Sequence, residues 1–161
     1  MAEYERGDLS TREIFSRFVT MTGYRGTFEQ FCALWRGILS ENHLMIEFAR
    51  DLSRRYDIYI WSNAGDLHMP WAYEQFPVLQ FIKGDAVSCY LGAVKPNRAF
   101  FERALAKYDL RPEQVLFVDD RPENVEAARA MGIITVQYTT ASETIDAIRA
   151  QLNGTSAPGT S

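Results

Sequence analysis

Two carboxylates stand side by side at the end of an apolar run. Asp119 and Asp120 follow the segment 115–118 (VLFV) with no polar residue between. A short apolar run rich in β-formers predicts a buried parallel strand. Adjacent negative charges at the end of such a strand are unfavourable unless positive groups meet them. The pair therefore predicts a site at which positive groups gather.

Two other predicted strands also end in polar residues. Ser62-Asn63 closes the β-branched and aromatic segment 57–63, and Lys95 follows a short strand predicted at 86–90. Taken singly, these residues are explained by helix caps, first-turn acids or a solvated lysine. Ligands of open parallel sheets, however, bind beyond the carboxyl ends of the strands. Together the residues suit a phosphoryl site, in which the carboxylates hold Mg²⁺ and the hydroxyl and ammonium groups bind phosphoryl oxygens.

The elements that must position these residues alternate between helix and strand from Glu41 onward, which predicts a parallel α/β sheet. The first forty residues are purely helical, and Ser10 with Glu13 forms a capping box at the start of one helix. Gly132 suits the left-handed position that ends a helix. The further helices are expected at 28–39, 41–54, 67–75, 98–108, 122–131 and 143–152, and a last strand at 133–138. We expect a helical cap over 1–40, an α/β core over 41–152 and a disordered polar tail over 153–161.

Composition narrows the class of protein. The chain has 161 residues, 47% of them hydrophobic and 24% charged, which is ordinary for one globular domain. A net charge of −4 argues against a broad nucleic-acid-binding face. No apolar segment approaches the length of a membrane span, the N-terminus does not resemble a signal peptide, and Cys32 and Cys89 form no metal or redox motif. We expect a cytoplasmic protein with no nucleic-acid or membrane partner, and the sequence leaves its oligomeric state open.

The three polar segments, taken with their neighbours, resemble a known superfamily. IWSN, GAVKPNRAFFERAL and VLFVDDRPENVEAARAMGI are similar to motifs II, III and IV of the haloacid dehalogenase-like (HAD) hydrolases. YERGDLS and SNAGDLH are typical of the subgroup that contains bacterial α-D-glucose-1-phosphate phosphatase and the phosphatase domain of soluble epoxide hydrolase. The resemblance covers about residues 4–150 and implies a Rossmann-like parallel sheet with a small helical cap. It also implies a Mg²⁺-dependent phosphatase of small phosphorylated metabolites, such as sugar phosphates.

The resemblance implies a role for each site residue. Ser62 and the backbone N–H of Asn63 would bind the phosphoryl group, and Lys95 would neutralise the nucleophile and the transferring phosphoryl. Asp120 would bind Mg²⁺ directly, Asp119 would act through a water, and Asn124 would support their loop. His68 is common at this place and is interpreted as structural. On this basis Lys95→Ala is expected to lower activity and to leave folding stability almost unchanged.

Motif I, the Asp-x-Asp-like pair that follows the first strand in this family, has no counterpart in the sequence. Its first Asp is the nucleophile that forms an aspartyl-phosphate, and its second is the general acid/base. Asp8 lies in a polar loop, Asp57 begins a strand, and Asp119 is followed two residues later by Arg121, so none fits. We expect an N-terminally truncated chain that is inactive by itself. The absent strand would lie between the strands ending at Ser62 and Asp120, and its apolar side chains would contribute about 8–15 kcal/mol.

Other functions remain open at this point. A response-regulator receiver has a similar set of groups, but its acid pair comes first in the chain. A haloacid dehalogenase needs no metal and typically carries one Asp in motif IV. The alternative from another class is a catalytically dead phosphate-binding or interaction protein that never had the nucleophile.

Overall fold

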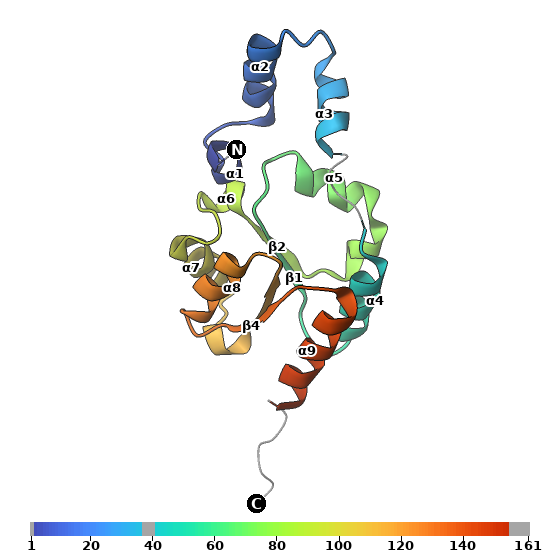
Figure 1. Cartoon of the computed structure of the whole chain (residues 1–161), viewed down its shortest axis with the longest axis vertical. Coiled ribbons are helices and arrows are strands. Elements are labelled where there is room, and N and C mark those ends of the chain that lie inside the picture. The colour runs from blue at the N-terminus through green and yellow to red at the C-terminus, as the bar shows by residue number, and fades with distance from the viewer. Residues whose placement is uncertain (1, 37–40, 155–161) are drawn as a thin grey trace, which may run out of the picture.

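The computed structural model describes residues 2–36 and 41–154 and has the expected α/β architecture (Figure 1). Four short parallel strands form its centre: β1 (Tyr59–Ser62), β2 (Gly84–Val87), β3 (Leu116–Asp119) and β4 (Ile134–Gln137). The helices that precede β1 are α1 (Ala2–Arg6), α2 (Thr11–Thr22), α3 (Phe28–Arg36) and α4 (His43–Leu52). Those that follow are α5 (His68–Gln75), α6 (Ser88–Leu91), α7 (Arg98–Lys107), α8 (Pro122–Arg129) and α9 (Ala141–Gly154), with 3₁₀ turns at Pro77–Phe81 and Pro112–Gln114.

The strands pair in two separate groups. β1 pairs with β2 in a register that sets Trp61 opposite Ala86, and β3 pairs with β4 with Phe117 opposite Thr135. Within the described residues no strand joins β1 to β3. A cavity of about 730 Å³ lies there and is lined by residues of both strands. The sheet is thus interrupted at the place where the sequence predicts an absent strand.

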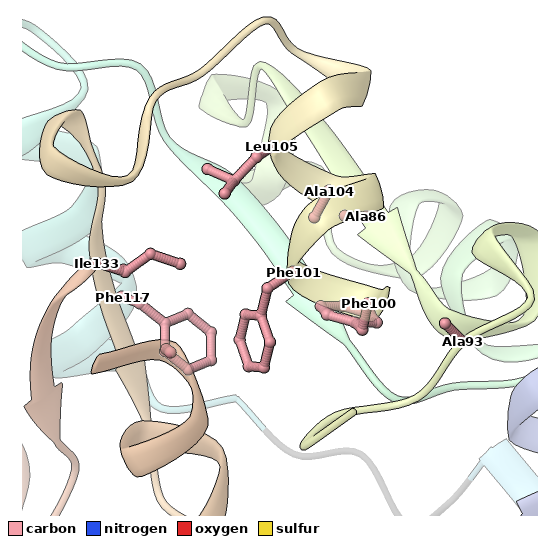
Figure 2. Packing of buried hydrophobic residues seen from close by; sticks show 9 residues of the cluster. Ala86, Ala93, Phe100, Phe101, Ala104, Leu105, Phe117 and Ile133 are labelled. Carbon is pink, nitrogen blue, oxygen red and sulfur yellow. The ribbon is translucent and has the colours of Figure 1, made fainter. Parts of the chain in front are cut away.

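The main hydrophobic core packs one face of both strand pairs against α7 and α8. Phe100 and Phe101 of α7 are fully buried, and the ring of Phe101 meets Phe117 of β3 edge-on at 5.6 Å between centroids (Figure 2). Trp61 of β1 lies 5.8 Å from the same Phe117 ring. These aromatic contacts link β1 and β3 through side chains, although their backbones are not paired.

The cap region begins with a helix that lies against the core. α1 packs on α6, and Tyr4 of α1 is only 1% exposed. A Cβ on Gly65 would lie 2.0 Å from the Tyr4 ring, so this close approach requires glycine at that position. α2 and α3 project away from the sheet (Figure 1) and pack on each other through phenylalanine rings, among them Phe18 and Phe31 at 5.4 Å. α1 therefore packs against the core, although the sequence analysis assigns residues 1–40 to the cap. The domain boundary at residue 40 stays a prediction.

Most local predictions agree with the structure. The Ser10–Glu13 capping box is present, with the Ser10 N–H donating to Glu13 Oε2 at 2.8 Å. Gly132 has the left-handed φ of +84° that its place after a helix requires. Both cysteines are free, and burial raises the pKa of each thiol, to about 11 for Cys89.

One strand prediction is wrong in position. The segment 86–90 was expected to be extended, whereas β2 ends at Val87 and residues 88–91 form α6. Ser88 turns the chain there, because its hydroxyl is fully buried and bonded to the backbone of Ala64.

The chain ends differ from the prediction by smaller amounts. α9 reaches Gly154, two residues into the predicted tail, which is a usual uncertainty for a helix end. The rest of that tail and residues 37–39 of the predicted helix 28–39 lie outside the described residues. Among the helices that the structure does describe, none has the length and apolar character to cross a bilayer.

Candidate active site

Three segments that are distant in the sequence meet at the carboxyl edge of the strands. Ser62 ends β1, Asp119 ends β3, and Lys95 lies in the loop between α6 and α7. The strands are parallel, so their carboxyl ends face the same side of the molecule. The residues predicted from sequence as one site are therefore brought to one place.

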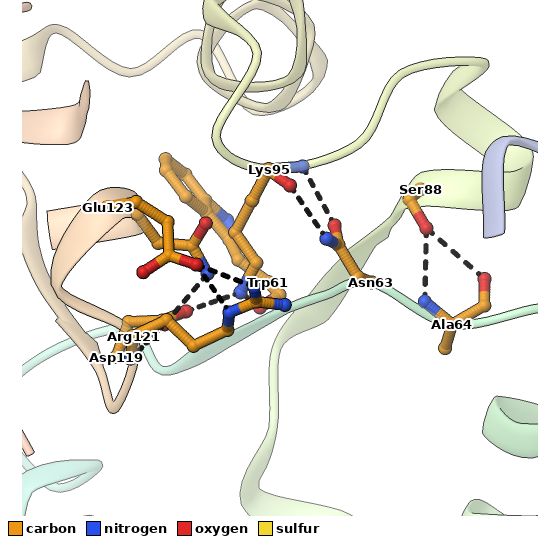
Figure 3. A network of polar contacts seen from close by, with 9 residues as sticks. Trp61, Asn63, Ala64, Ser88, Lys95, Asp119, Arg121 and Glu123 are labelled. Carbon is orange, nitrogen blue, oxygen red and sulfur yellow. Dashed lines mark hydrogen bonds and ion pairs between the residues drawn. The ribbon is translucent and has the colours of Figure 1, made fainter. Parts of the chain in front are cut away.

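Lys95 connects the two halves of the interrupted sheet. Its ammonium donates to Asp119 Oδ2 at 2.6 Å and to the Trp61 carbonyl of β1 at 2.7 Å (Figure 3). Lys95 and Asp119 are 8% and 9% exposed. A buried charge of either sign is unfavourable alone, so each of these groups depends on the other.

Asp119 is surrounded by donors. The backbone N–H of Arg121 donates to its Oδ1 at 3.0 Å, and Asn124 Nδ2 donates to the same oxygen at 2.8 Å. Burial alone would raise the pKa of Asp119, but the hydrogen bonds from Lys95 and Asn124 outweigh it and hold the pKa below its ordinary value. The carboxylate is therefore an ionised, fixed group whose two oxygens are both engaged.

Asn63 holds the loop after β1 against the loop that carries Lys95. Its Nδ2 donates to the Lys95 carbonyl at 2.9 Å, and the Lys95 N–H donates to Asn63 Oδ1 at 2.8 Å (Figure 3). This reciprocal pair sets the backbone from which the Lys95 side chain reaches Asp119. The Ser62 hydroxyl, half-buried at the end of β1, has no hydrogen-bond partner among the described residues.

The two acids of the predicted pair have different environments. Asp120 is exposed, and its backbone carbonyl accepts a bond from Gln137 Nε2 at 3.4 Å. Its carboxylate makes no hydrogen bond or ion pair within the part of the chain described, so it is available to a ligand. Mg²⁺ binds through one or two carboxylates and keeps several waters. Asp120 is therefore suited to bind Mg²⁺ directly, and Asp119 is suited to act on the ion through a water. Among the described residues there is no cluster of three Asp, Glu, His or Cys side chains that could hold a metal ion.

The remaining Asp candidates are occupied away from this edge. Asp8 accepts a hydrogen bond from Arg6 Nε at 2.7 Å, and Asp57 is paired with Lys83 at 2.6 Å before β1 begins. Neither position gives a carboxylate at the carboxyl end of a strand. The structure therefore supports neither Asp8 nor Asp57 as a nucleophile.

Sequence reasoning missed two residues that shape the site. Ser88 Oγ accepts the Ala64 N–H at 3.0 Å and thereby fixes the loop that follows Ser62. Asp66, in the same loop, accepts the Thr11 N–H at 3.2 Å and also the Thr11 hydroxyl, which ties this loop to the start of α2. A polar residue inside the apolar strand predicted at 86–90 was a signal for Ser88, whereas the Thr11–Asp66 contact spans 55 residues and had none. His68 is buried, and its ring meets Tyr4 edge-on at 6.3 Å.

Comparison with known proteins decides the family. The model of the haloacid dehalogenase-like hydrolases matches residues 41–132, which is more than half of the chain. The chain belongs to the haloacid dehalogenase-like hydrolase family. The match begins just before α4 and ends after α8, so it includes the HAD segments that carry Ser62, Lys95 and Asp120.

Individual proteins resemble the chain over most of its length. D-ribitol-5-phosphate phosphatase of Bacteroides thetaiotaomicron is 28% identical over 84% of this chain and 69% of its own. A sesquiterpene phosphatase of Aspergillus oryzae is 27% identical over 85% of this chain and 71% of its own. A HAD family enzyme of B. thetaiotaomicron, solved with magnesium and inorganic phosphate, has a TM-score of 0.79 at 23% identity, covering 86% of this chain and 74% of that one. The last likeness confirms the Rossmann-like parallel fold.

Proposed function

We propose that this HAD hydrolase site performs Mg²⁺-dependent hydrolysis of small phosphate monoesters. The observation that carries the proposal is the position of the Lys95 ammonium between the ends of β1 and β3. A buried cation at the carboxyl edge of a parallel sheet stabilises the negative charge of a transferring phosphoryl group. Because Asp119 neutralises Lys95 in the resting site, the cation is held in place before a substrate arrives.

The surrounding groups fit the parts that phosphoryl transfer needs. The unpartnered Ser62 hydroxyl and the Asn63 backbone N–H bind phosphoryl oxygens beside Lys95. Asp120 would hold Mg²⁺ directly, and Asp119 would act on the ion through a water. The ion, when bound, neutralises phosphoryl oxygens as a Lewis acid. Asn124 keeps Asp119 oriented through the 2.8 Å bond from its amide.

The proposed substrates are small phosphorylated metabolites, and sugar phosphates are the first to test. Support comes from the two similar phosphatases, whose names specify a sugar-alcohol phosphate and a sesquiterpene phosphate. The alcohol parts of these two substrates differ widely, whereas both substrates are phosphate esters. The residues at the carboxyl edge therefore account for phosphate recognition, and the α2–α3 cap is assigned to the alcohol.

The chain of 161 residues by itself is proposed to be inactive. Attack on phosphorus needs a carboxylate in line with the leaving oxygen, and no Asp in the sequence follows a strand in the family's pattern. Binding of phosphate without an attacking group leaves the chemical step unassisted. The aspartyl-phosphate route requires an Asp placed at the carboxyl end of the cavity between β1 and β3.

The test compares the chain with a version extended at its N-terminus by an apolar strand that ends in an Asp-x-Asp pair. Both are assayed on p-nitrophenyl phosphate and a panel of sugar phosphates, with Mg²⁺ and with chelator. We expect no turnover above background from the 161-residue chain. We expect chelator-sensitive turnover from the extended one, lost in its Asp120→Asn variant.

Two outcomes would contradict the proposal. Turnover by the unextended chain that vanishes in Asp120→Asn would show that a nucleophile is present within it. A folded extended protein that hydrolyses no ester, while its melting temperature still responds to inorganic phosphate, would support the non-catalytic binding protein. Arg98→Met serves as the control, since its exposed ion pair with Glu102 lies on α7 and outside the site.

A further inference from the structure

Two sequence segments that the proposed chemistry leaves unexplained meet at the base of the cap. They are YERGDLS at residues 4–10 and SNAGDLH at residues 62–68. The first runs from α1 to the start of α2, and α1 packs against α6 of the core (Figure 1). The second starts at the end of β1 with the two residues proposed to bind phosphate. The base of α2 and the phosphate-binding loop are therefore parts of one junction.

A glycine in each segment lets the backbone of this junction approach closely. Gly7 has a left-handed φ of +86°, and a Cβ added there would collide with the Cys89 carbonyl of α6. Gly65 lies against the Tyr4 ring, where a Cβ would collide as well. α1 and the loop 62–68 are thus in direct contact, with no room for a larger residue at either position.

Three side chains join the two segments through a directed chain of hydrogen bonds. The Thr11 hydroxyl donates to Asp66 Oδ1, and the Thr11 backbone N–H donates to the same oxygen at 3.2 Å. A hydroxyl has one proton to donate, so the Tyr4 hydroxyl, 2.9 Å from Thr11 Oγ1, is the donor in that contact. The chain of hydrogen bonds therefore runs from Tyr4 through Thr11 to the Asp66 carboxylate.

Burial keeps these hydrogen bonds in one arrangement. Tyr4 and Thr11 are both buried. Burial raises the pKa of the Tyr4 hydroxyl and outweighs a backbone hydrogen bond from Leu67, which lowers it, so the hydroxyl keeps its proton at neutral pH. A buried hydroxyl that loses its partner is unfavourable, so any other placement of α2 against the loop costs free energy.

The same loop is fixed to the core just before Asp66. The Ala64 N–H donates to Ser88 Oγ at 3.0 Å, and the Asn63 side chain pairs with the backbone of Lys95. The Asp66 carboxylate therefore has a set position relative to the proposed phosphate site. Its bonds to Thr11, the first residue of α2, give the base of the cap a set position as well.

We propose that Tyr4, Thr11 and Asp66 are positioning residues for the alcohol part of the substrate, because they hold the base of the α2–α3 cap at a fixed place relative to the phosphate. The inference rests on the proposed function, in which the carboxyl edge recognises phosphate and the cap recognises the alcohol. A displaced cap loses contacts to the alcohol, whereas Ser62 and Lys95 still bind the phosphate. A misplacement of about 1 Å in a positioning group can cost about a hundredfold.

The proposed inactivity of the chain allows a test at equilibrium, because a phosphate ester that it binds is not consumed. The isotope-labelled 161-residue chain is titrated, in buffer with Mg²⁺, with inorganic phosphate, ribose 5-phosphate and glucose 6-phosphate. Amide NMR shifts give a dissociation constant for each ligand. We expect at least one sugar phosphate to bind more tightly than inorganic phosphate. The ratio of the two dissociation constants measures the contribution of the alcohol.

Substitutions at the junction should change that ratio. Thr11→Val removes the hydroxyl and is expected to weaken sugar-phosphate binding about tenfold while inorganic-phosphate binding changes less than about twofold. Tyr4→Phe keeps the ring against Gly65 and is expected to give the same split to a smaller extent. Thr11→Ser retains the hydroxyl and is expected to bind both ligands as the unchanged chain does. Thr20→Val is the control on the exposed face of α2 and is expected to change neither affinity.

A purely structural role predicts a different pattern. Partial unfolding lowers the affinity for both ligands by the same factor, so an equal loss in Thr11→Val overturns the inference. Three other results overturn it: unchanged affinities in Thr11→Val and Tyr4→Phe, an equal loss of sugar-phosphate binding in Thr11→Ser, or no sugar phosphate that binds more tightly than inorganic phosphate. Circular dichroism shows whether each variant is folded, and Tyr4→Phe decides the matter if Thr11→Val is not.

The proposed function and this inference fail in different ways. Absence of any response to inorganic phosphate would contradict the proposed phosphate site, and the inference with it. Phosphate binding without the expected split would contradict the inference alone. An extended protein that hydrolyses no ester, while the split is observed in the 161-residue chain, would contradict the catalytic proposal and support the positioning role.

Discussion

At the scale of single residues, Lys95 contributes both to folding stability and to the proposed chemistry of the site. From the sequence alone its removal is expected to cost little stability, because the acids and the phosphate site would no longer be held against each other. The structure gives a different expectation. The ammonium is buried and bonded to Asp119 and to the Trp61 carbonyl, so its loss leaves a buried carboxylate without its cation.

Lys95→Met is therefore expected to lower the free energy of unfolding by about 3–5 kcal/mol, the usual range when one partner of a buried pair is removed. Urea unfolding at neutral pH measures it. Arg98→Met removes an exposed pair with Glu102 and is expected to change stability by at most about 0.5 kcal/mol. The same Lys95→Met change should cost less in an Asp119→Asn background. An equal cost in both backgrounds would show that the two groups are not energetically coupled.

At the scale of elements, a part-buried polar contact ties the start of α2 to the core. The Thr11 hydroxyl bonds to Asp66, and the Tyr4 and Thr11 hydroxyls lie 2.9 Å apart. Thr11 is the first residue of α2, and Asp66 lies in the loop that follows β1. The attachment of α2 to this loop thus depends on a group that is 5% exposed.

Thr11→Val keeps the shape of this side chain and removes its hydroxyl. We expect a loss of about 1–3 kcal/mol, because the buried Tyr4 hydroxyl and the Asp66 carboxylate each lose a hydrogen bond. Hydrogen exchange should quicken in α2 more than in β3. Thr20→Val is the matched control on the same helix, where an exposed hydroxyl bonds to the Ser16 carbonyl. Equal effects of the two substitutions would argue against a positioning role for Thr11.

At the scale of the whole molecule, the interrupted sheet limits stability. The core packs well between the strands and α7, but the side that faces α4 and α9 surrounds a cavity of about 730 Å³. Apolar side chains that line a void lose contacts and hydrophobic burial. Any group that fills the void without strain should stabilise the chain.

Ala49→Leu adds apolar carbons to α4 inside that cavity, with little change in helix propensity. We expect the free energy of unfolding to rise by about 1–2 kcal/mol, from about 0.8 kcal/mol per buried methylene. Ala147→Leu on the exposed face of α9 is expected to have almost no effect. Thermal and urea unfolding of both variants provide the measurement. Destabilisation by Ala49→Leu would mean that the cavity closes in solution.

The sequence by itself determined the alternation of helices and strands and predicted the site groups, because both depend on local pattern. Alternating helix and strand periods predicted the parallel α/β fold, and polar residues at three strand ends predicted that Ser62, Lys95 and Asp119 would meet. The exact end of β2 was missed, since Ser88 turns the chain through a bond to Ala64, 24 residues away. Only the tertiary structure decided that Asp119 rather than Asp120 pairs with Lys95, and that Asp66 connects the site to the cap. Adjacent acids are alike in a sequence pattern, but Asp119 is the buried last residue of β3, whereas Asp120 follows the strand and is exposed.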